Sequence, residues 1–385
     1  MAEPASVPLD PASTPSRVIV VGGGLVGLSC AWRLLLRGHE VQLIDHDAGP
    51  AQLNGSQAAL GVLMARVFHR SSGRSWRLRQ QSLELWKLWR LDLASRDLPI
   101  PWRQGLLLLA ADAADQERHQ RLIGDRRRQP LGLELWERSR LEALSPALPN
   151  GALSGLYSHD DGQLDPLGAL EAISLDADRL GIRRRQGTAT TLEKASGGWR
   201  VHLREGGQCQ ADWVVLCGGL GLQEPLASLG RELAMEPVLG QALELERTDP
   251  QTGPAGRSRW TWPGVIHWQG ANLIPRPDLT GGDRLWLGAT LEPGREASHD
   301  ALQALRCLNG AAPPWLEQAV ERRRWHGLRT RPLDRPAPVL ELIAPGVLLA
   351  SGHYRNGVLL APATATWVVE QVEAGRTHTQ LRRYL

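Results

Sequence analysis

The sequence predicts an α/β fold with two interleaved parts, one built on a parallel sheet and one built on an antiparallel sheet. Near the N-terminus, and again near the C-terminus, a buried-strand pattern runs into a glycine turn and then into an apolar helix. Between them, residues 236–291 alternate apolar and polar side chains in short runs, which is typical of antiparallel strands with one buried face. The chain therefore changes architecture in its middle and returns to the first architecture at its end.

The overall composition is that of an ordinary globular protein. With 385 residues, of which 42% are hydrophobic, the chain can bury a substantial core. Its 44 basic and 41 acidic residues nearly cancel to a net charge of +3, so a nucleic acid is not expected as a partner. No apolar stretch approaches the roughly 20 residues that span a bilayer, so no membrane span is expected.

The four cysteines and the N-terminal segment bear on location. Cysteines form neither a CxxC pair nor a zinc-binding spacing with histidine, so we expect no metal site and no disulfide framework. A reducing cytoplasm fits this pattern. Residues 1–16 are rich in Pro, Ala and Ser and lack the basic start and apolar segment of a secretory signal. They are predicted to form a disordered leader.

A strand, a helix and a second strand follow this leader. Arg17–Val21 is a short β-branched run of the kind that forms a buried parallel strand. Residues 25–36 are good helix formers, and Gly38 lies where a helix stop is expected. Glu40–Asp45 then reads as a strand that ends in a carboxylate. These elements predict one compact strand, turn, helix and strand unit.

The next segment is predicted to contain a loop and a long helix. Residues 53–65 have too irregular a period for a strand, so we expect a loop with a short helical turn. Residues 75–93 carry apolar side chains at helical spacing, which predicts an amphipathic helix with one face in the core. Residues 112–145 are charged and contain helical stretches. The apolar positions of the long helix are Trp76, Leu83, Trp86, Trp89 and Leu93.

Strand patterns return in the second half of the chain. Residues 187–192 and 199–203 predict strands, and residues 211–221 predict a buried strand that ends in glycines. Residues 347–350, a GHYRNG turn and a helix over 358–372 complete the chain. The alternating runs of the antiparallel sheet are 241–246, 262–268, 271–276 and 284–290.

The first glycine turn carries a dinucleotide-binding pattern, in the Rossmann-like arrangement. Gly22 allows the tight turn, Gly24 lets the backbone approach a pyrophosphate, and Gly27 permits close packing of helix and strand. The N-terminus of the following helix offers free N–H groups to the phosphates. Asp45 ends the second strand, where a carboxylate can accept hydrogen bonds from both ribose hydroxyls and would repel a 2′-phosphate. The ligand is therefore NAD or FAD.

Three features favour FAD. The motif lies at the extreme N-terminus, a second glycine-ended strand recurs at 213–219, and a third glycine turn opens a helix at 352–358. An extended flavin cofactor needs such distant pieces of chain, because its two ends lie far apart. We therefore expect an FAD-binding domain with a parallel sheet and an interleaved substrate domain with an antiparallel sheet.

Further motifs are more specific than the nucleotide pattern. GLRTRPLDRPAP at 327–338 is followed by GHYRNGVLLAP at 352–362. They are accompanied by GSQAALGVL at 55–63, DGQLDPLGAL at 161–170 and LGAT at 287–290. With these segments the chain resembles the D-amino-acid oxidase type of FAD-dependent oxidoreductases, in particular the glycine oxidases. The resemblance extends over most of the chain.

The resemblance implies a set of FAD-binding residues. No cysteine follows Cys307, so the covalent flavin link of sarcosine-oxidase relatives is not expected, and FAD should bind non-covalently. Besides Gly22, Gly24, Gly27, Gly218 and Gly219, the implied residues are Leu25 and Val26 at the phosphates, Asp45 and His46 near the ribose, Gly55, Ser56, Leu60, Gly61 and Val62 in the loop along pyrophosphate and flavin, Ala189 near the adenine, and His353, Tyr354, Arg355, Asn356, Gly357, Val358 and Leu359 around the isoalloxazine ring.

Three residues are implied at the substrate. Arg329 of the GLR motif would grip the substrate carboxylate through its planar guanidinium, and Arg355 resembles a second active-site arginine. Asn272 stands where glycine oxidases have a tyrosine that helps to bind the carboxylate. An amide can still donate a hydrogen bond, but it is shorter and leaves a gap of roughly one phenol ring, which would admit a larger substrate. His353 is expected to organise the turn rather than to act as a base.

The expected function is FAD-dependent oxidative deamination of a small amino acid. In the glycine-oxidase-like form, glycine gives an imine and then glyoxylate with ammonia and hydrogen peroxide, and the imine serves thiamin thiazole synthesis. Two alternatives stay open: a D-amino-acid or N-methyl-amine oxidase or dehydrogenase on the same fold, which Asn272 favours, and a flavin-binding protein without turnover. The partners are an amino acid and dioxygen or another electron acceptor, and a homo-oligomer is compatible with the sequence. The expected FAD-binding domain comprises residues 17–95, 150–225 and 325–385, and the substrate domain residues 96–149 and 226–324.

Overall fold

The computed structural model describes residues 15–46, 53–126, 129, 131–248, 260–277 and 283–382, with side chains up to residue 375. Of the expected leader, residues 1–14 lie outside this range, whereas Ser16 is buried and its carbonyl accepts a hydrogen bond from the Glu40 N–H at 3.0 Å. The described strands form three sheets, and the fold is of the mixed α/β class that the sequence predicts. Among the described residues, no helix is long and apolar enough to cross a membrane.

The first sheet has six strands in the order β18-β19-β11-β1-β2-β7. Five of them run parallel, and β18 is antiparallel to β19 at the edge. The central strands are almost entirely buried, as the continuous apolar runs predict. The strands are β1 (Arg17–Val21), β2 (Glu40–Asp45), β7 (Arg183–Gln186), β11 (Trp213–Leu216), β18 (Val339–Ala344) and β19 (Val347–Ser351).

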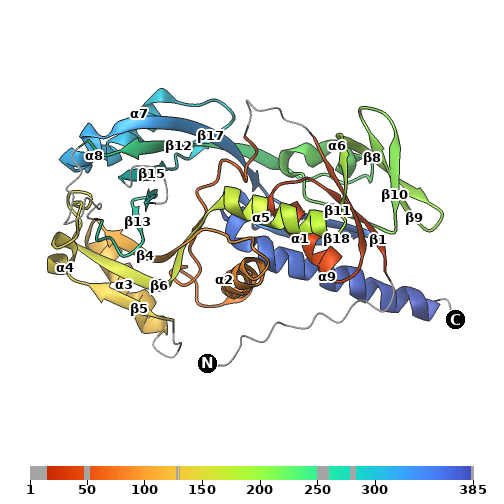
Figure 1. Cartoon of the computed structure of the whole chain (residues 1–385), viewed down its shortest axis with the longest axis horizontal. Helices are drawn as coiled ribbons and strands as arrows, with labels where there is room; N and C mark the ends of the chain where they lie inside the picture. Colours follow the sequence, from red (N-terminus) through yellow and green to blue (C-terminus); the bar gives the residue numbers. More distant parts are fainter. Residues whose placement is uncertain are drawn as a thin grey trace.

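Four long helices pack beside this sheet (Figure 1). Their apolar faces share one core with β1 and β2, and α1 contacts both α5 and α9. The predicted apolar face of α2 is confirmed, since all five of its named tryptophans and leucines are buried. Trp32 on α1 donates a hydrogen bond from Nε1 to Asp176 on α5 at 2.7 Å. The helices are α1 (Leu25–Leu36), α2 (Gly73–Ala94), α5 (Pro166–Arg179) and α9 (Gly357–Arg382).

The second sheet has ten strands and is the predicted antiparallel sheet. Its order is β16-β12-β15-β14-β13-β4-β6-β3, with β17 paired to β12 and β5 paired to β6. One pairing departs from the expected pattern, because β13 and β4 run parallel. The strands are β3 (Val62–Leu63), β4 (Trp102–Ala110), β5 (Leu133–Trp136), β6 (Ser154–Leu164), β12 (Met235–Glu246), β13 (Val265–Trp268), β14 (Ala271–Pro275), β15 (Arg284–Gly288), β16 (Glu292–Pro293) and β17 (Val320–Pro332).

Smaller elements complete the two ends of the molecule. A three-stranded sheet lies at one end in Figure 1, and α4, α7 and α8 lie toward the other. The small sheet consists of β8 (Ala189–Ala195), β9 (Gly198–Leu203) and β10 (Gln208–Ala211). The remaining helices are α3 (Ala113–Arg126), α4 (Arg138–Glu142), α6 (Gln223–Ala227), α7 (His299–Arg306) and α8 (Pro314–Gln318), with short 3₁₀ turns η1 (Gly219–Leu222), η2 (Leu308–Gly310) and η3 (Tyr354–Asn356).

The two long strands β6 and β17 bear on the expected domain boundaries. Both belong to the ten-stranded sheet, although most of their residues lie in segments that the sequence assigned to the FAD-binding domain. Both also pass from that sheet toward the parallel-sheet domain, since β6 leads directly into α5 and β17 is followed by β18. In the proposed division into two domains, β6 and β17 therefore belong with the antiparallel sheet.

Candidate active site

A cavity of about 1410 Å³ lies between the parallel sheet and the ten-stranded sheet. It is larger than the range of roughly 300–1,000 Å³ that is typical of small-molecule sites. Its wall includes the first glycine turn at one end and residues of β13, β14 and β17 at the other. The cavity therefore has room for an extended cofactor together with a small substrate.

The glycine turn is shaped for a ligand that approaches the backbone. Gly22 has φ +106°, and a Cβ there would lie 2.8 Å from the backbone of Gly218. A Cβ on Gly27 would overlap the Gly22 carbonyl oxygen, so helix and strand pack in direct contact. Both positions require glycine for the reasons that the sequence pattern predicts.

The N-terminus of α1 is open to an anionic group. Its N-cap is Gly24, which offers no side-chain cap, and its first turn has no acidic residue. The Leu25 N–H donates to Ser56 Oγ at 2.9 Å, which brings the 55–63 loop over the helix end. A Cβ on Gly24 would come within 3.1 Å of Ser56 Oγ. This narrow, positively polarised cradle fits the pyrophosphate of a dinucleotide.

The ribose end of the site is formed by Asp45 and the small sheet. The Asp45 carboxylate lines the cavity next to Gly23, where a Cβ would overlap it. Gly187, Thr188 and Ala189 form the wall beside it. An acid next to a hollow with small residues fits an adenosine ribose, so the residues present fit FAD along this half of the cavity.

The GHYRNG segment forms the opposite end of the cofactor half. It leaves β19 through η3, where Tyr354 has φ +54°, and leads into α9. Arg79 on α2 donates to Asn356 Oδ1 at 2.8 Å, and Trp86 Nε1 donates to the Val358 carbonyl at 2.9 Å. Helix α2, which the sequence predicts only as a core helix, therefore holds this turn in place.

His353 begins that turn and contacts the helix that follows it. It is buried and its Nε2 lies 2.9 Å from Thr364 Oγ1 on α9. Burial lowers the pKa of His353 to about 3, so the imidazole is neutral at physiological pH. These contacts fit the organising role that the sequence favours for His353 over a role as base.

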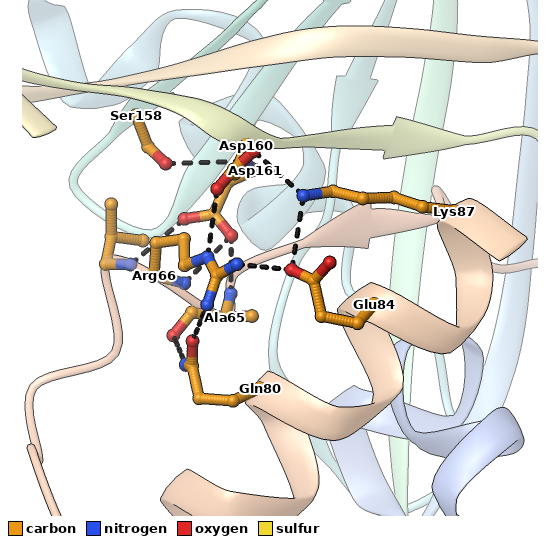
Figure 2. Close-up of polar contacts among 9 residues, drawn as sticks. Ala65, Arg66, Gln80, Glu84, Lys87, Ser158, Asp160 and Asp161 are labelled. Atoms are coloured by element: carbon orange, nitrogen blue, oxygen red, sulfur yellow. Dashed lines mark hydrogen bonds and ion pairs between the residues drawn. The ribbon is translucent and has the colours of Figure 1, made fainter. Parts of the chain in front are cut away.

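The segment after β3, which supplies part of the cavity wall, is held by a buried acid (Figure 2). Asp161 on β6 accepts hydrogen bonds from the backbone N–H groups of Ala65, Arg66 and Val67 at 2.7–3.0 Å. Burial raises the pKa of the Asp161 carboxyl even though these three donors favour its charged form. The neighbouring Asp160 pairs with Lys87 at 2.8 Å. The DGQLD motif thus positions a wall of the cavity.

A buried ion pair joins the residue after β14 to the start of α5. Arg276 lies 2.9 Å from Asp165, the N-cap residue of α5. This contact joins the end of β14 to the helix that follows β6. The ion pair lies outside the lining of the cavity. It supports the packing of the two sides of the cavity.

Arg329 on β17 projects from the ten-stranded sheet into the cavity. Its Nη1 donates to the carbonyl oxygens of Leu239 and Thr290 at 3.2 and 3.1 Å. The guanidinium lies against Gly240, where any Cβ would overlap it. Burial, with a smaller effect from the nearby charge of Arg355, lowers the pKa of Arg329 to about 10, which leaves it a cation at neutral pH.

The remaining donors of Arg329 are unused within the described residues. Neither Nε nor Nη2 has a hydrogen-bond partner there, and no described carboxylate forms an ion pair with this guanidinium. A fixed cation with two free donors on one edge fits a carboxylate, which can accept both N–H groups in parallel. Arg355 lines the same cavity and adds a second positive charge.

Asn272 on β14 lines the cavity from the neighbouring strands. Its Oδ1 lies 2.9 Å from Nδ1 of His267, the residue directly opposite on β13. Gln269 and Gly270, both with positive φ, form the two-residue turn that sets this register. His267 also lines the cavity and was missed by the sequence analysis. The Gln269-Gly270 turn between two strands was the signal that could have placed it opposite Asn272.

The structure brings nearly all of the expected site residues to this one cavity. Leu25 and Leu359 are the exceptions, because their side chains are buried in the helical core. The expected residues that line the cavity are Gly22, Gly24, Val26, Gly27, Asp45, His46, Gly55, Ser56, Leu60, Gly61, Val62, Ala189, Gly218, Gly219, Asn272, Arg329, His353, Tyr354, Arg355, Asn356, Gly357 and Val358.

Comparisons with known proteins bear on the family and the fold of the chain. The family model described as "DAO: FAD dependent oxidoreductase" matches residues 17–371. A glycine oxidase of Geobacillus kaustophilus is 28% identical over 375 residues, which cover 94% of this chain and 93% of the relative. The bifunctional protein ThiO/ThiG of Synechocystis is 28% identical over 382 residues. This chain covers only 52% of that longer protein, so it spans about half of its length.

A solved structure shows the same fold. The crystal structure of the glycine oxidase from Geobacillus kaustophilus superposes with a TM-score of 0.80 at 24% identity. The match covers 93% of this chain and 95% of that one. The parallel sheet, the antiparallel sheet and their arrangement around the cavity are thus those of a known flavoprotein fold.

Proposed function

Because this chain belongs to the DAO family of FAD-dependent oxidoreductases, we propose that it oxidises the carbon next to the amino group of a small amino acid. The observation that carries this proposal is Arg329, a fixed cation with two free donors in the cavity that also contains the dinucleotide turn. FAD, when bound, supplies the acceptor for the hydride, and its electrons pass on to dioxygen or another acceptor.

Arg329 fixes the carboxylate end of the substrate. Its two backbone contacts hold the guanidinium, so that Nε and Nη2 present a rigid fork toward the cavity. A substrate gripped at its carboxylate loses most of its rotational freedom, which places the adjacent carbon and nitrogen reproducibly. The GHYRNG turn, held by Arg79 and Trp86, forms the opposing wall.

The charges of the cavity favour the amine in its neutral form. Arg329 and Arg355 both lie in the substrate half, while Asp45, the acid that lines the cavity, is at the dinucleotide end. A protonated amine would bring a further positive charge close to two guanidiniums, which is unfavourable at short range. The neutral amine is also the form whose neighbouring C–H can give up a hydride.

Glycine and slightly larger amino acids are the proposed substrates. The relatives named above include glycine oxidases, but Asn272 is shorter than the tyrosine that the resemblance to glycine oxidases implies at this position. A cavity with Asn272 has room for a side chain or an N-methyl group, which favours D-amino acids or N-methyl amino acids as the second candidate class. For glycine, the imine product would serve thiamin thiazole synthesis. We also propose that the protein is located in the cytoplasm.

A substrate screen tests the proposal. Purified protein would be assayed for hydrogen peroxide, and in parallel for reduction of an artificial dye, with glycine, sarcosine and a series of D-amino acids. Activity on one of these classes, with competitive inhibition by simple carboxylates, is expected. If carboxylates do not compete and only amines without a carboxylate react, then Arg329 does not bind substrate as proposed.

A further inference from the structure

His267 and Asn272 form a polar pair on the wall of the substrate half of the cavity. His267 lies on β13 and Asn272 on β14, directly opposite each other across the tight turn. The two atoms in contact are His267 Nδ1 and Asn272 Oδ1, 2.9 Å apart. Both residues line the cavity that contains Arg329 and Arg355.

This contact determines which nitrogen of His267 carries the hydrogen. An amide oxygen can only accept a hydrogen bond, so Nδ1 must be the donor. In the neutral imidazole, Nε2 then has a lone pair and no hydrogen. Burial lowers the pKa of His267. The hydrogen bond with Asn272 opposes this effect and the charge of Arg355 adds to it, and the net lowering keeps the imidazole neutral near pH 7.

The lone pair of Nε2 is free to act on a ligand. Nε2 makes no hydrogen bond with any described residue, yet it is not sealed inside the protein. The pair with Asn272 holds the ring, so its orientation in the cavity is fixed. By contrast, the guanidiniums of Arg329 and Arg355 can only donate. His267 Nε2 thus offers a hydrogen-bond acceptor that these two guanidiniums cannot provide.

We propose that His267 accepts a hydrogen bond at Nε2 from the amino group of the substrate, and that Asn272 is a positioning residue that fixes its tautomer. This inference rests on the proposed function. The cation Arg329 takes the carboxylate, and the neutral acceptor takes the N–H group of the amine. The pair therefore selects amino acids whose nitrogen bears a hydrogen, that is primary and secondary amines, over tertiary amines.

The test compares three substrates that differ only at nitrogen: glycine, sarcosine and N,N-dimethylglycine. The FAD-loaded wild type, His267→Ala and His267→Gln would be assayed, with His326→Ala as the matched control. His326 is exposed on β17 and lies outside the cavity lining, so its loss should leave all values unchanged. Propionate, which has the carboxylate but no amine, would be measured as a competitive inhibitor of each variant.

His267→Ala should lower kcat/KM for the better of glycine and sarcosine by about 10-fold, the effect of one net hydrogen bond. The inhibition constant of propionate should stay within about twofold, since it needs only Arg329. The ratio of kcat/KM for that substrate to kcat/KM for N,N-dimethylglycine should fall by a similar factor. The His267→Gln variant should recover part of the lost kcat/KM, because its amide oxygen can accept a hydrogen bond. A merely structural role would instead weaken propionate as much as the substrates.

Asn272→Asp tests the positioning role. The charged and titratable groups around His267 are Arg355 from η3 and His119 from α3. A carboxylate in place of the amide would stabilise the imidazolium and raise the pKa of His267. An imidazolium cannot accept a hydrogen bond at Nε2. The acidic limb of the pH profile of kcat/KM should therefore move to higher pH in Asn272→Asp. In His267→Gln, which has no imidazole, this acidic limb should be absent.

The outcomes separate this inference from the proposed function. If the wild type oxidises none of the amino acids, the proposed function fails. If it does oxidise them, but His267→Ala keeps the wild-type kcat/KM and the same discrimination against the tertiary amine, then the role of His267 is refuted while the function stands. An unshifted acidic limb in Asn272→Asp would refute the positioning role of Asn272.

Discussion

Replacing Arg329 by alanine removes a cation that the structure holds fixed in the cavity and that we propose binds the substrate carboxylate. Its Nη1 is fixed by the carbonyls of Leu239 and Thr290, and its Nε and Nη2 have no hydrogen-bond partner among the described residues. Alanine would therefore remove both a charge and a two-donor fork. Since Arg329 lies against Gly240 and its Nη1 is bound to the carbonyls of Leu239 and Thr290, the cofactor half should keep its shape.

The expected loss follows from that geometry. A charge-assisted, two-donor contact in a partly desolvated site is worth roughly 2–4 kcal/mol, which corresponds to about 30- to 1,000-fold in kcat/KM. Because the carboxylate is not the reacting group, most of the loss should appear as a raised KM. Lysine should restore only part, since it keeps the charge but not the planar fork.

The assay is steady-state kinetics on Arg329→Ala and Arg329→Lys with the best substrate of the wild type. Flavin content and the thermal midpoint of each variant serve as controls, and both should remain near the wild-type values. The reasoning is refuted if Arg329→Ala keeps a near-normal KM for every substrate that the wild type accepts. Loss of bound flavin in that variant would instead make Arg329 a structural residue.

Three further predictions concern the cofactor and the substrate range. Gly24→Val should abolish flavin binding, because the cradle at the N-terminus of α1 has a Cβ position only 3.1 Å from Ser56 Oγ; a normal ratio of flavin absorbance to protein absorbance would contradict this placement. Acid precipitation should release intact FAD into the supernatant, because no cysteine follows Cys307; flavin that stays with the pellet would show a covalent link. Asn272→Tyr should raise the ratio of kcat/KM for glycine to kcat/KM for D-alanine, because a phenol fills the gap beside Asn272 and also removes the amide that contacts His267. An unchanged ratio would mean that Asn272 does not limit the size of the substrate.

The nucleotide half of the site could be predicted from sequence because its determinants are local. The strand Arg17–Val21, the three glycines and Asp45 lie within one continuous unit, in which Gly22 is required by its positive φ and Gly27 by close packing. A sequence pattern reports such features directly. The expected lining by the GHYRNG segment relied instead on the resemblance, since nothing in the local pattern links this segment to the glycine turn.

Three long strands of the ten-stranded sheet, β4, β6 and β17, were not predicted, and each omission has a physical reason. In β4 the run Leu106–Leu109 is built from a residue that favours helices as much as strands. In β6 the polar residues Asp160, Asp161 and Gln163 are used to bind other segments rather than to mark a surface. The first half of β17 is exposed and rich in arginine, so it shows no alternation of buried and exposed positions.

The substrate half depends on contacts between strands distant in sequence, which no local pattern reports. Arg329 was identified through its motif, but its fixation by Leu239 and Thr290 follows only from the pairing of β12 and β17 and the course of the chain after β15. His267 carries no motif, and its relation to Asn272 depends on the hairpin register. A single histidine in a strand does not by itself indicate a ligand site.

Anaerobic reduction of the bound flavin tests the central claim most directly, because it needs neither oxygen nor a guess about the electron acceptor. The purified FAD-loaded protein would be mixed without oxygen with glycine, sarcosine or D-alanine, and the flavin absorbance near 450 nm would be followed. We predict that at least one of these amino acids bleaches the flavin, with a rate that saturates with substrate and weakens in Arg329→Ala. A flavin that stays oxidised with every amino acid but is reduced by dithionite would contradict amino-acid oxidation.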